Sequence, residues 1–492
     1  MIPFLGYAPD LPSTTPGILT NCTSLVPSLK GMKGAPSPQN TLLPVLAAAC
    51  RGASVGRKLD NTTRFFAGTA TKLYEAGTSS WTDRTRAAGG DYNLGSDNRW
   101  RFAQLGDTSI AVAKSDILQS SASGAFANAA ANAPKAAVVE VANGFTFLFD
   151  VNDQGAIFDS ADRPHGWWAA RTLTTWTPSV ANEAYTGSLT STPGKIRAGR
   201  RFGQSIIAYK DRSMYLGNYI GESGWEFTLI PGEAGAVSQE VVIDVGTSEN
   251  PMHIFMGFDD FYRFDGSRPV PIGSPLKETV FGELNKGFSY GCQALHDRIN
   301  SRIYFYYPVG SSINPDKCVV YNYKTNQWGR DDRTVEAIVE YINAGITYDD
   351  LGTYYSTYQD LPNASYDAAF WSAGYPSAAI FNTLHRVQTI DGVSLASTMI
   401  TGDYGSDEMI SLLSRVQPQF LTKPTAATMT NYYRDNLGDS LSSDTAVSMD
   451  SKGRFDVYNG GRSANWHRAS FSFTGDVEMP GIRADLQEDG LE

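Results

Sequence analysis

The 492-residue sequence predicts an all-β protein: a six-bladed β-propeller with an irregular N-terminal arm and a C-terminal β-sandwich-like domain. Three observations predict this class. The composition is rich in glycine (47), tyrosine (25) and phenylalanine (24), a mixture that favours short strands joined by tight turns. Segments with a helical period are short. Two-residue alternation and short apolar runs bounded by turn residues occur along the whole chain, so strands are expected throughout.

Six segments define the predicted propeller, because each contains a short apolar strand, a polar turn and a second short strand. Their apolar runs occupy both odd and even positions, which indicates strands covered on both faces. A lone hairpin is marginally stable in water, and a ring lets each small sheet cover the next. One or two large β-sandwiches remain an alternative on the hairpin pattern alone. The six segments are residues 64–75, 109–119, 145–158, 205–216, 253–264 and 318–328.

The prediction divides the chain into three parts. Residues 1–60 are rich in proline, which cannot donate to a β-ladder, so they are expected to form an extended arm over the body. Residues 61–390 hold the hairpins and form the propeller. Residues 391–492 contain short strands about ten residues apart, the spacing of a β-sandwich. An aromatic loop at residues 361–376 is expected to be covered by the body or a partner, or to bind a sugar.

The charge balance limits the partners that the chain can bind. Lysine and arginine number 40 against 51 acidic residues, which gives a net charge of −11. Phosphate neutralisation supplies most of the affinity of nucleic-acid binders, so DNA is not expected as a tightly held partner. The negative net charge remains compatible with DNA that slides past a protein wall that repels it. The sequence shows no signal peptide and no apolar run near the ~20 residues needed to cross a bilayer, which predicts synthesis in a cytoplasm without membrane insertion.

The cysteines and histidines form no disulfide framework and no metal-ligand spacing. His165 lies beside Trp167 and Trp168, a grouping that could form a carbohydrate platform but is more typical of ring packing. A calcium loop is suggested by residues 150–155, but its twelfth position is Ala161, which cannot coordinate. We therefore predict no catalytic, cofactor-binding or metal-binding residues. The residues considered are Cys22, Cys50, Cys292, Cys318, His165, His253, His296, His385 and His467.

Two other classes of function remain open from composition. A propeller-type glycosidase would need two carboxyl groups about 5–9.5 Å apart across a cleft, and the sequence supplies paired acids at turns. Adjacent acids in turns are usually only solvated, so the prediction is that the protein is not an enzyme. A passive sugar- or receptor-binding tip has the same composition. The paired acids are Asp259, Asp260, Asp331, Asp332, Asp349 and Asp350.

The order of several short motifs resembles the tail hub, or head-to-tail stabilisation, proteins of short-tailed bacteriophages. Each motif alone is a common strand–turn–strand unit, and the resemblance comes from their succession over nearly the whole chain. The alanine-rich residues 121–134 and the aromatic loop depart from the family pattern. The motifs are residues 15–18, 21–22, 34–36, 252–266, 269–273, 319–328, 379–392, 414–418, 461–462 and 473–476.

This resemblance implies a structural virion protein of the tail, made in the bacterial host cytoplasm. The family forms a ring around the DNA ejection channel, which we expect to be a homo-hexamer. It joins the head-to-tail adaptor protein to the nozzle, needle or tail fibre proteins, with DNA only as passing cargo. It supplies no catalytic residues to carry over to this chain.

Overall fold

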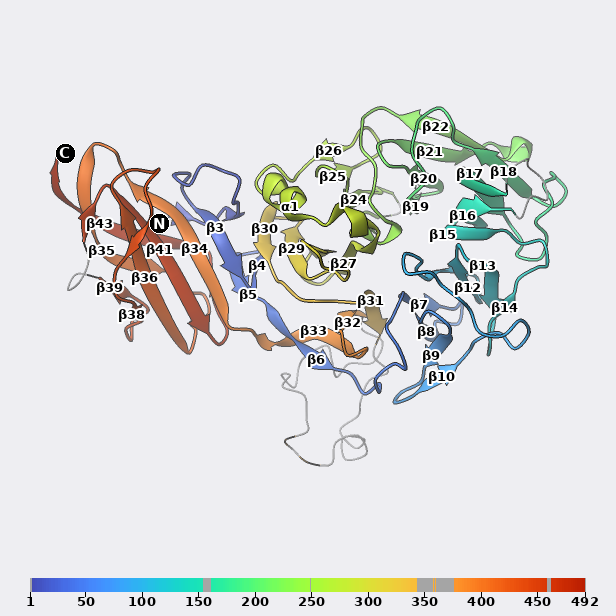
Figure 1. Cartoon of the computed structure of the whole chain (residues 1–492), viewed down its shortest axis with the longest axis horizontal. Coiled ribbons are helices and arrows are strands. Elements are labelled where there is room, and N and C mark those ends of the chain that lie inside the picture. The colour runs from blue at the N-terminus through green and yellow to red at the C-terminus, as the bar shows by residue number, and fades with distance from the viewer. Residues whose placement is uncertain are drawn as a thin grey trace.

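The computed structural model describes residues 2–153, 161–247, 249–342, 357, 359, 376–457 and 462–491. It is an all-β protein, as the composition predicts. A ring of small sheets forms one part and two packed sheets form the other (Figure 1). The few helices in the described residues are α1 (Lys277–Glu283) and the 3₁₀ segments η1 (Gly221–Ser223), η2 (Gln239–Val241) and η3 (Lys286–Gly291).

The first four blades of the ring follow one another along the chain, each an antiparallel sheet running from an inner to an outer strand. Blades 2 and 3 are also joined by one pair, Ile117 with Lys135. Blade 1 is β7 (Ala53–Arg57), β8 (Thr63–Gly68), β9 (Leu73–Ala76) and β10 (Trp81–Asp83); blade 2 is β11 (Arg101–Leu105), β12 (Thr108–Ala113), β13 (Asp116–Ser121) and β14 (Ala127–Asn128); blade 3 is β15 (Lys135–Ala142), β16 (Phe145–Asn152), β17 (Asp162–Ala170) and β18 (Ala184–Ser188); blade 4 is β19 (Ala198–Phe202), β20 (Ser205–Tyr209), β21 (Met214–Tyr219) and β22 (Trp225–Ile230).

Three further blades complete the ring, and the last takes its outer strand from the N-terminal region. Blade 5 is β23 (Val242–Asp244), β24 (His253–Met256), β25 (Phe261–Phe264) and β26 (Val270–Pro271); blade 6 is β27 (Gln293–Asp297), β28 (Arg302–Tyr307), β29 (Lys317–Asn322) and β30 (Gln327–Arg330); blade 7 is β31 (Ala337–Ile342), β32 (Pro376–Phe381), β33 (Val387–Ser394) and β6 (Pro36–Asn40).

The inner strands close the ring. Contacts run in order through β7, β11, β15, β19, β23, β27 and β31, and β31 returns to β7. The described residues therefore form a seven-membered, propeller-like ring, and the prediction of six blades is wrong. The predicted hairpins lie in blades 1 to 6, where they appear as pairs such as β8–β9 and β24–β25. In blade 7, β31 and β32 do not form a compact hairpin, because residues 343–375 separate them along the chain.

The N-terminal region is not the irregular arm that its prolines suggested. It forms β1 (Ile2–Pro3), β2 (Gly6–Tyr7), β3 (Ile18–Thr23), β4 (Leu25–Ser28) and β5 (Gly31–Gly34) before β6 and β7. Pro36 and Pro38 lie on β6, the outermost strand of blade 7. An edge strand tolerates proline because one side of its backbone has no ladder partner that needs an N–H.

The C-terminal part consists of two sheets that pack face to face. The first has the order β1-β43-β35-β39, with β40 on β35, and the second has the order β2-β3-β34-β41-β36-β37, with β38 on β36. Alternate apolar side chains such as Leu413, Phe455 and Phe471 meet between the sheets. The strands are β34 (Ser397–Gly405), β35 (Met409–Pro418), β36 (Ala426–Arg434), β37 (Ser442–Ser443), β38 (Val447–Ser448), β39 (Phe455–Asp456), β40 (Ser463–Ala464), β41 (Trp466–Thr474) and β43 (Gly481–Leu491).

Backbone ladders join the ring to this sandwich. The sheet of blade 6 continues through β4 and β5 to β42 (Glu478–Met479), in the order β27-β28-β29-β30-β4-β5-β42. The N-terminal strands take part in both parts, because β6 pairs antiparallel with β33 in blade 7 and β3 pairs antiparallel with β34 in the sandwich (Figure 1). One hydrophobic cluster contains Phe261 and Trp328 of the ring together with Met399 and Phe471 of the sandwich. The junction, which we define as β3 to β6, β30, β33, β34 and β42, therefore makes the two parts one body.

Candidate functional site

Residues of the inner strands line several cavities along the axis of the ring, which we call together the axial channel. They run in the same direction around the axis, so their ends gather at two opposite mouths. A cavity of about 590 Å³ lies toward the C-terminal ends of these strands and is called the C-end cavity. A cavity of about 230 Å³ lies at their N-terminal ends and is called the N-end cavity. Polar side chains lie between the two cavities.

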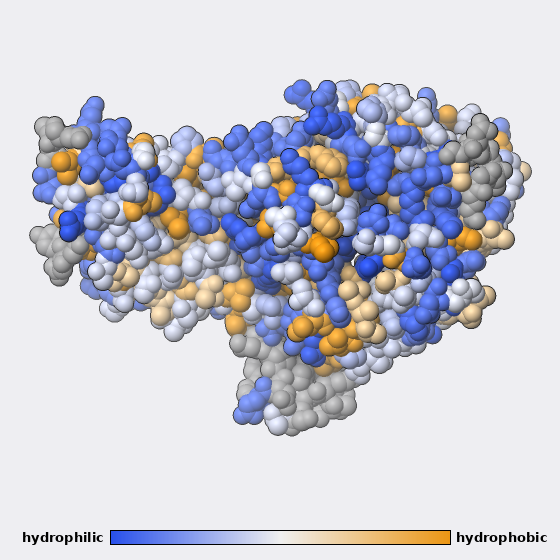
Figure 2. Space-filling view, viewed as in Figure 1, coloured by the Kyte–Doolittle hydropathy of each residue, from blue (hydrophilic) through white to orange (hydrophobic). Residues whose placement is uncertain are grey.

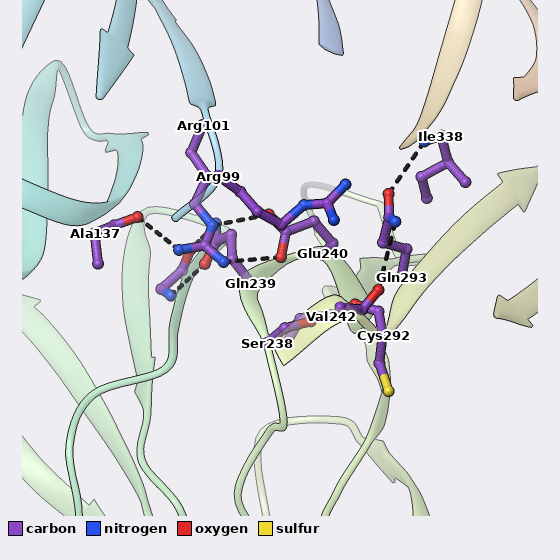
Figure 3. A network of polar contacts seen from close by, with 12 residues as sticks. Arg99, Arg101, Ala137, Ser238, Gln239, Glu240, Val242, Cys292, Gln293 and Ile338 are labelled. Carbon is purple, nitrogen blue, oxygen red and sulfur yellow. Dashed lines mark hydrogen bonds and ion pairs between the residues drawn. The ribbon is translucent and has the colours of Figure 1, made fainter. Parts of the chain in front are cut away.

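An ion pair crosses the channel between these cavities. Arg101 starts β11 in blade 2, and its Nε and Nη2 donate to the two carboxylate oxygens of Glu240 at 2.8 and 3.0 Å (Figure 3). Glu240 lies in η2, just before the inner strand of blade 5. Arg101 Nη1 also donates to the carbonyl oxygen of Ala137 in blade 3, at 2.7 Å. One guanidinium thus ties three blades together through bidentate geometry, the strongest form of such a contact.

Two glutamines lie beside this ion pair, and we call the four side chains of Arg101, Glu240, Gln239 and Gln293 the polar plug. The side chain of Gln239 accepts from Gly199 N at 2.7 Å and donates to Gly199 O at 2.8 Å, which fixes η2 to blade 4. Gln293 accepts from Ile338 N at 3.1 Å (Figure 3). It also donates to the Glu336 carbonyl at 3.1 Å, so it ties blade 6 to blade 7. Each amide satisfies backbone groups at the start of an inner strand, so the plug is part of the ring's hydrogen-bonding structure.

Charged groups of both signs line the C-end cavity. Arg200 lies 3.2 Å from Glu140 and also donates to the carbonyl oxygen of Val242. Burial raises the pKa of Glu140 and outweighs the opposing effect of Arg200. Burial likewise raises the pKa of Asp244, and burial next to Arg298 lowers the pKa of His296 to about 4. At neutral pH, His296 is therefore an uncharged imidazole.

The plug itself is ionised. Burial opposes the charge on Glu240, but the ion pair with Arg101 outweighs it, and the pKa of Glu240 lies below its ordinary value. Among the described lining residues of the C-end cavity there is no tryptophan, tyrosine or phenylalanine to stack on a sugar ring. The chemistry of this cavity is ion pairing and hydrogen bonding.

The paired acids that the sequence singled out are bound into blade structure. Asp260 accepts from Phe261 N at 2.7 Å and from Gly273 N at 2.9 Å, and so closes the turn between β24 and β25. Asp259 accepts from the Tyr262 hydroxyl at 2.9 Å. None of these residues lines the C-end cavity.

The second acidic pair is also structural. Asp331 is buried against Arg333 at 2.8 Å, and its burial raises its pKa. Asp332 lies 2.9 Å from both Lys317 and Arg330. Asp349 and Asp350, and all but Pro376 of the aromatic loop at 361–376, fall outside the described residues.

The other sequence candidates also have structural partners. Trp167 and Trp168 are buried in blade 3, and Trp168 donates to Asp153 at 2.6 Å, so their role is packing. Asp153 also holds Arg163, and Asp150 holds Lys114, which occupies two carboxylates of the suggested calcium loop. Residues 154 and 155 of that loop lie outside the described part of the chain. No group of three or more potential metal ligands occurs in the described ranges.

All four cysteines are buried and free. Burial raises the pKa of the Cys22, Cys50 and Cys292 thiols to about 12, so they are unreactive thiols at neutral pH. His253 is also buried, and its role is structural. Its Nδ1 lies 2.6 Å from the Tyr209 hydroxyl and its Nε2 lies 2.9 Å from the Arg201 carbonyl oxygen.

Sequence reasoning missed the axial residues. Arg101 and Glu240 are separated by 139 positions, and only closure of the ring brings them together. The sequence did contain a signal for these residues. Charged or polar side chains stand directly before or at the start of apolar strands, where a turn residue is usual: Arg99, Arg101, Glu240 and Gln293.

The fold and channel define an all-β protein with a propeller-like ring joined to a sandwich. No family model and no curated protein matches the chain. Solved structures that resemble it include YCF48 bound to a D1 peptide, at 11% identity and a TM-score of 0.39 over 75% of this chain and 97% of that one. YCF48 from Cyanidioschyzon merolae resembles it at 12% identity and a TM-score of 0.25, over 55% of this chain and 95% of that one. S. cerevisiae Dbp5 bound to Nup159 and Gle1 resembles it at 10% identity and a TM-score of 0.28, over 66% of this chain and 72% of that one. Likenesses this loose say nothing about function. None of the helices in the described ranges is long and apolar enough to span a membrane.

Proposed function

We propose that this chain is a non-catalytic building block of a short-tailed bacteriophage tail, a hub that forms a ring around the DNA ejection channel. The structural observation that carries the proposal is the junction. A single sheet runs from blade 6 through β4 and β5 to β42, so a load on the sandwich passes to the ring through backbone hydrogen bonds. The order of the sequence motifs supplies the phage context.

The proposed assembly is a homo-hexamer between the head-to-tail adaptor and the nozzle, needle or tail fibre proteins. A closed ring of identical subunits needs two different faces on each subunit, and an elongated body with a ring at one end and a sandwich at the other offers two. The face in Figure 2 is mostly hydrophilic with small scattered apolar groups, which suits contacts with a polar rim. The net charge of −11 disfavours adhesion of passing DNA.

Assembly of the purified protein with the tail adaptor tests this proposal. Co-sedimentation followed by electron microscopy is expected to show closed rings bound to the adaptor, and particles lacking the protein are expected to leak DNA. A protein that stays monomeric with the adaptor at high concentration, with particles that retain DNA without it, would contradict the hub.

A glycan-hydrolysing or glycan-binding tail protein is the alternative. One observation favours it. Glu140 and Asp244 line the same C-end cavity, and burial raises the pKa of both carboxyl groups. Release of sugar from bacterial surface polysaccharide by the wild type, lost in both Glu140→Gln and Asp244→Asn, would favour the enzyme over the hub. Equal, background-level release from all three proteins is the outcome that we expect.

A further inference from the structure

The N-end cavity gathers more positive than negative side chains. They come from the segments that precede the inner strands of blades 2 and 4 and from the end of β12, so they are far apart in sequence. The residues around the cavity also include Tyr290, whose hydroxyl group can hydrogen bond, and Ser238, whose hydroxyl already donates to the Cys292 carbonyl oxygen at 2.7 Å. Its cationic lining residues are Arg99, Arg101, Lys114, Lys195 and Arg197, and its acidic ones in the described chain are Asp97 and Asp150.

Three of the five cations are neutralised by carboxylates. Arg101 pairs with Glu240 in the plug. Arg197 lies 2.6 Å from Asp211, and Lys114 bonds to Asp150 and, at 2.8 Å, to Asp162. Lys195 and Arg99 are the two remaining cations of the cavity.

Lys195 has only a distant counter-charge. Its ammonium nitrogen is 3.9 Å from Asp150, whose other oxygen already bonds Lys114, and 45% of its side chain is exposed. Burial at the cavity wall lowers the pKa of Lys195, and the neighbouring cations Arg197 and Lys114 act in the same direction against the pull of Asp150. An ammonium group carries three donors, and an anion in the cavity could accept from them.

Arg99 has no carboxylate partner among the described residues. Its Nη2 donates to the Glu336 carbonyl at 2.7 Å, whereas its buried Nε has no acceptor in that set. Burial lowers the pKa of Arg99 and so disfavours its charge; Glu240 opposes this effect, whereas the like charges of Arg101 and Arg51 add to it. Leaving a buried charged donor unpaired is costly, and a bound anion would supply the missing acceptor and counter-charge.

We infer that the N-end cavity is a binding site for a small multivalent oxyanion of the phosphate or pyrophosphate class, held by Arg99 and Lys195 with the Tyr290 hydroxyl nearby. A volume of about 230 Å³ accommodates a group of this size. The plug forms the inner wall, because Arg101 lines both this cavity and the hollow behind it. The site lies between the starts of the inner strands of blades 2, 4 and 6, so the bound anion would link these strands at one end of the ring.

Calorimetric titration of the full chain with sodium pyrophosphate, and separately with inorganic phosphate, tests the site. Sodium chloride at matched ionic strength is the reference. Both Lys195→Gln and Arg99→Gln are expected to raise the Kd on the order of tenfold or more, because each removes a charge-assisted hydrogen bond. Binding is also expected to raise the Tm of the wild type, as any ligand of the native state does.

Two substitutions of exposed cations serve as controls. Lys30→Gln and Arg57→Gln remove the same charges at positions that do not line the N-end cavity, and their Kd values are expected to equal that of the wild type. If Arg99→Gln does not fold, the comparison of Lys195→Gln with Lys30→Gln decides the question alone. The inference is overturned if the wild type binds neither anion, or if all variants bind alike. The readout needs no tail assembly, so it is independent of the hub proposal.

Discussion

The free part of the ring and the junction are held together by different means. Around blades 1 to 5, neighbouring sheets meet mainly through side chains, with a plug of polar groups such as Arg101 and Glu240 at the axis. At the junction, strands from the N-terminal region add backbone ladders to blades 6 and 7 and to the sandwich. Side-chain packing can adjust when one residue changes, whereas a ladder fixes register over several residues. The junction is therefore the part of the molecule least able to deform.

The largest effect is expected from removing a ring side chain that also supports the junction. Trp328 is buried and packs on Phe261 and Tyr321 at centroid distances of 4.9 and 4.6 Å, inside the cluster that the ring and sandwich share. Trp328→Ala should lower the free energy of unfolding by about 3–5 kcal/mol. In chemical denaturation, ring and sandwich should lose structure together.

The matched control for that prediction is Trp176→Ala, which empties an equally buried site between blades 2 and 3, away from the junction. Its loss of stability should be similar in size, but the sandwich signal should persist through the first transition. If Trp328→Ala behaves in the same way, the junction is not the shared structural unit that we describe.

A glycine substitution should affect the junction almost as strongly. Gly31 has φ +143°, and a Cβ there would lie 2.3 Å from the Met479 carbonyl oxygen on β42. Gly31→Val should cost about 3 kcal/mol, because backbone must move on both sides of the ladder. Gly438→Val is the control, since a Cβ there meets open space and should change stability by no more than about 0.5 kcal/mol. Equal melting of the two variants would contradict close backbone approach at the junction.

A smaller effect is expected at the axis. Arg101 and Glu240 keep 15% and 17% of their side-chain surface exposed, so solvent weakens their pair. Glu240→Gln should cost about 2 kcal/mol, since it leaves the guanidinium without its counter-charge. A double-mutant cycle with Arg101→Met should give a coupling energy above about 0.5 kcal/mol. Additive losses would show that the plug does not tie the blades.

The smallest predicted effect depends on pH. Burial lowers the pKa of His253 to about 3, whereas the imidazole titrates near pH 6.5 in the unfolded chain. The unfolded state therefore binds a proton first, and stability that is complete above pH 6.5 is lost as the pH falls. Between pH 6.5 and pH 5 this residue should account for a loss of about 1.6 kcal/mol. His253→Gln should flatten the stability profile over that range, and an unchanged slope would contradict the assignment.

Local patterns were enough to predict part of the fold. Hairpins such as β8–β9 and β20–β21 join apolar strands through tight polar turns, so both strands and turn appear within about fifteen residues. The split between β31 and β32 spans residues 343–375, and the completion of blade 7 by β6 joins partners hundreds of positions apart, so neither leaves a local pattern. The Arg101–Glu240 pair leaves no local pattern either, because its residues are 139 positions apart in the sequence. Prolines on β6 signalled irregular backbone, although they fit an edge strand equally well.

The place of β6 in blade 7 has a consequence for biosynthesis. A ribosome makes residues 36–40 long before their partner strand, β33, which ends at Ser394. At typical rates of 5–20 residues per second, the delay is roughly 20 to 70 s. During this time the nascent segment must avoid pairing with other chains. Pro36 and Pro38 lack the amide hydrogens that such pairing would use, so they would protect the waiting strand from aggregation until the ring can close.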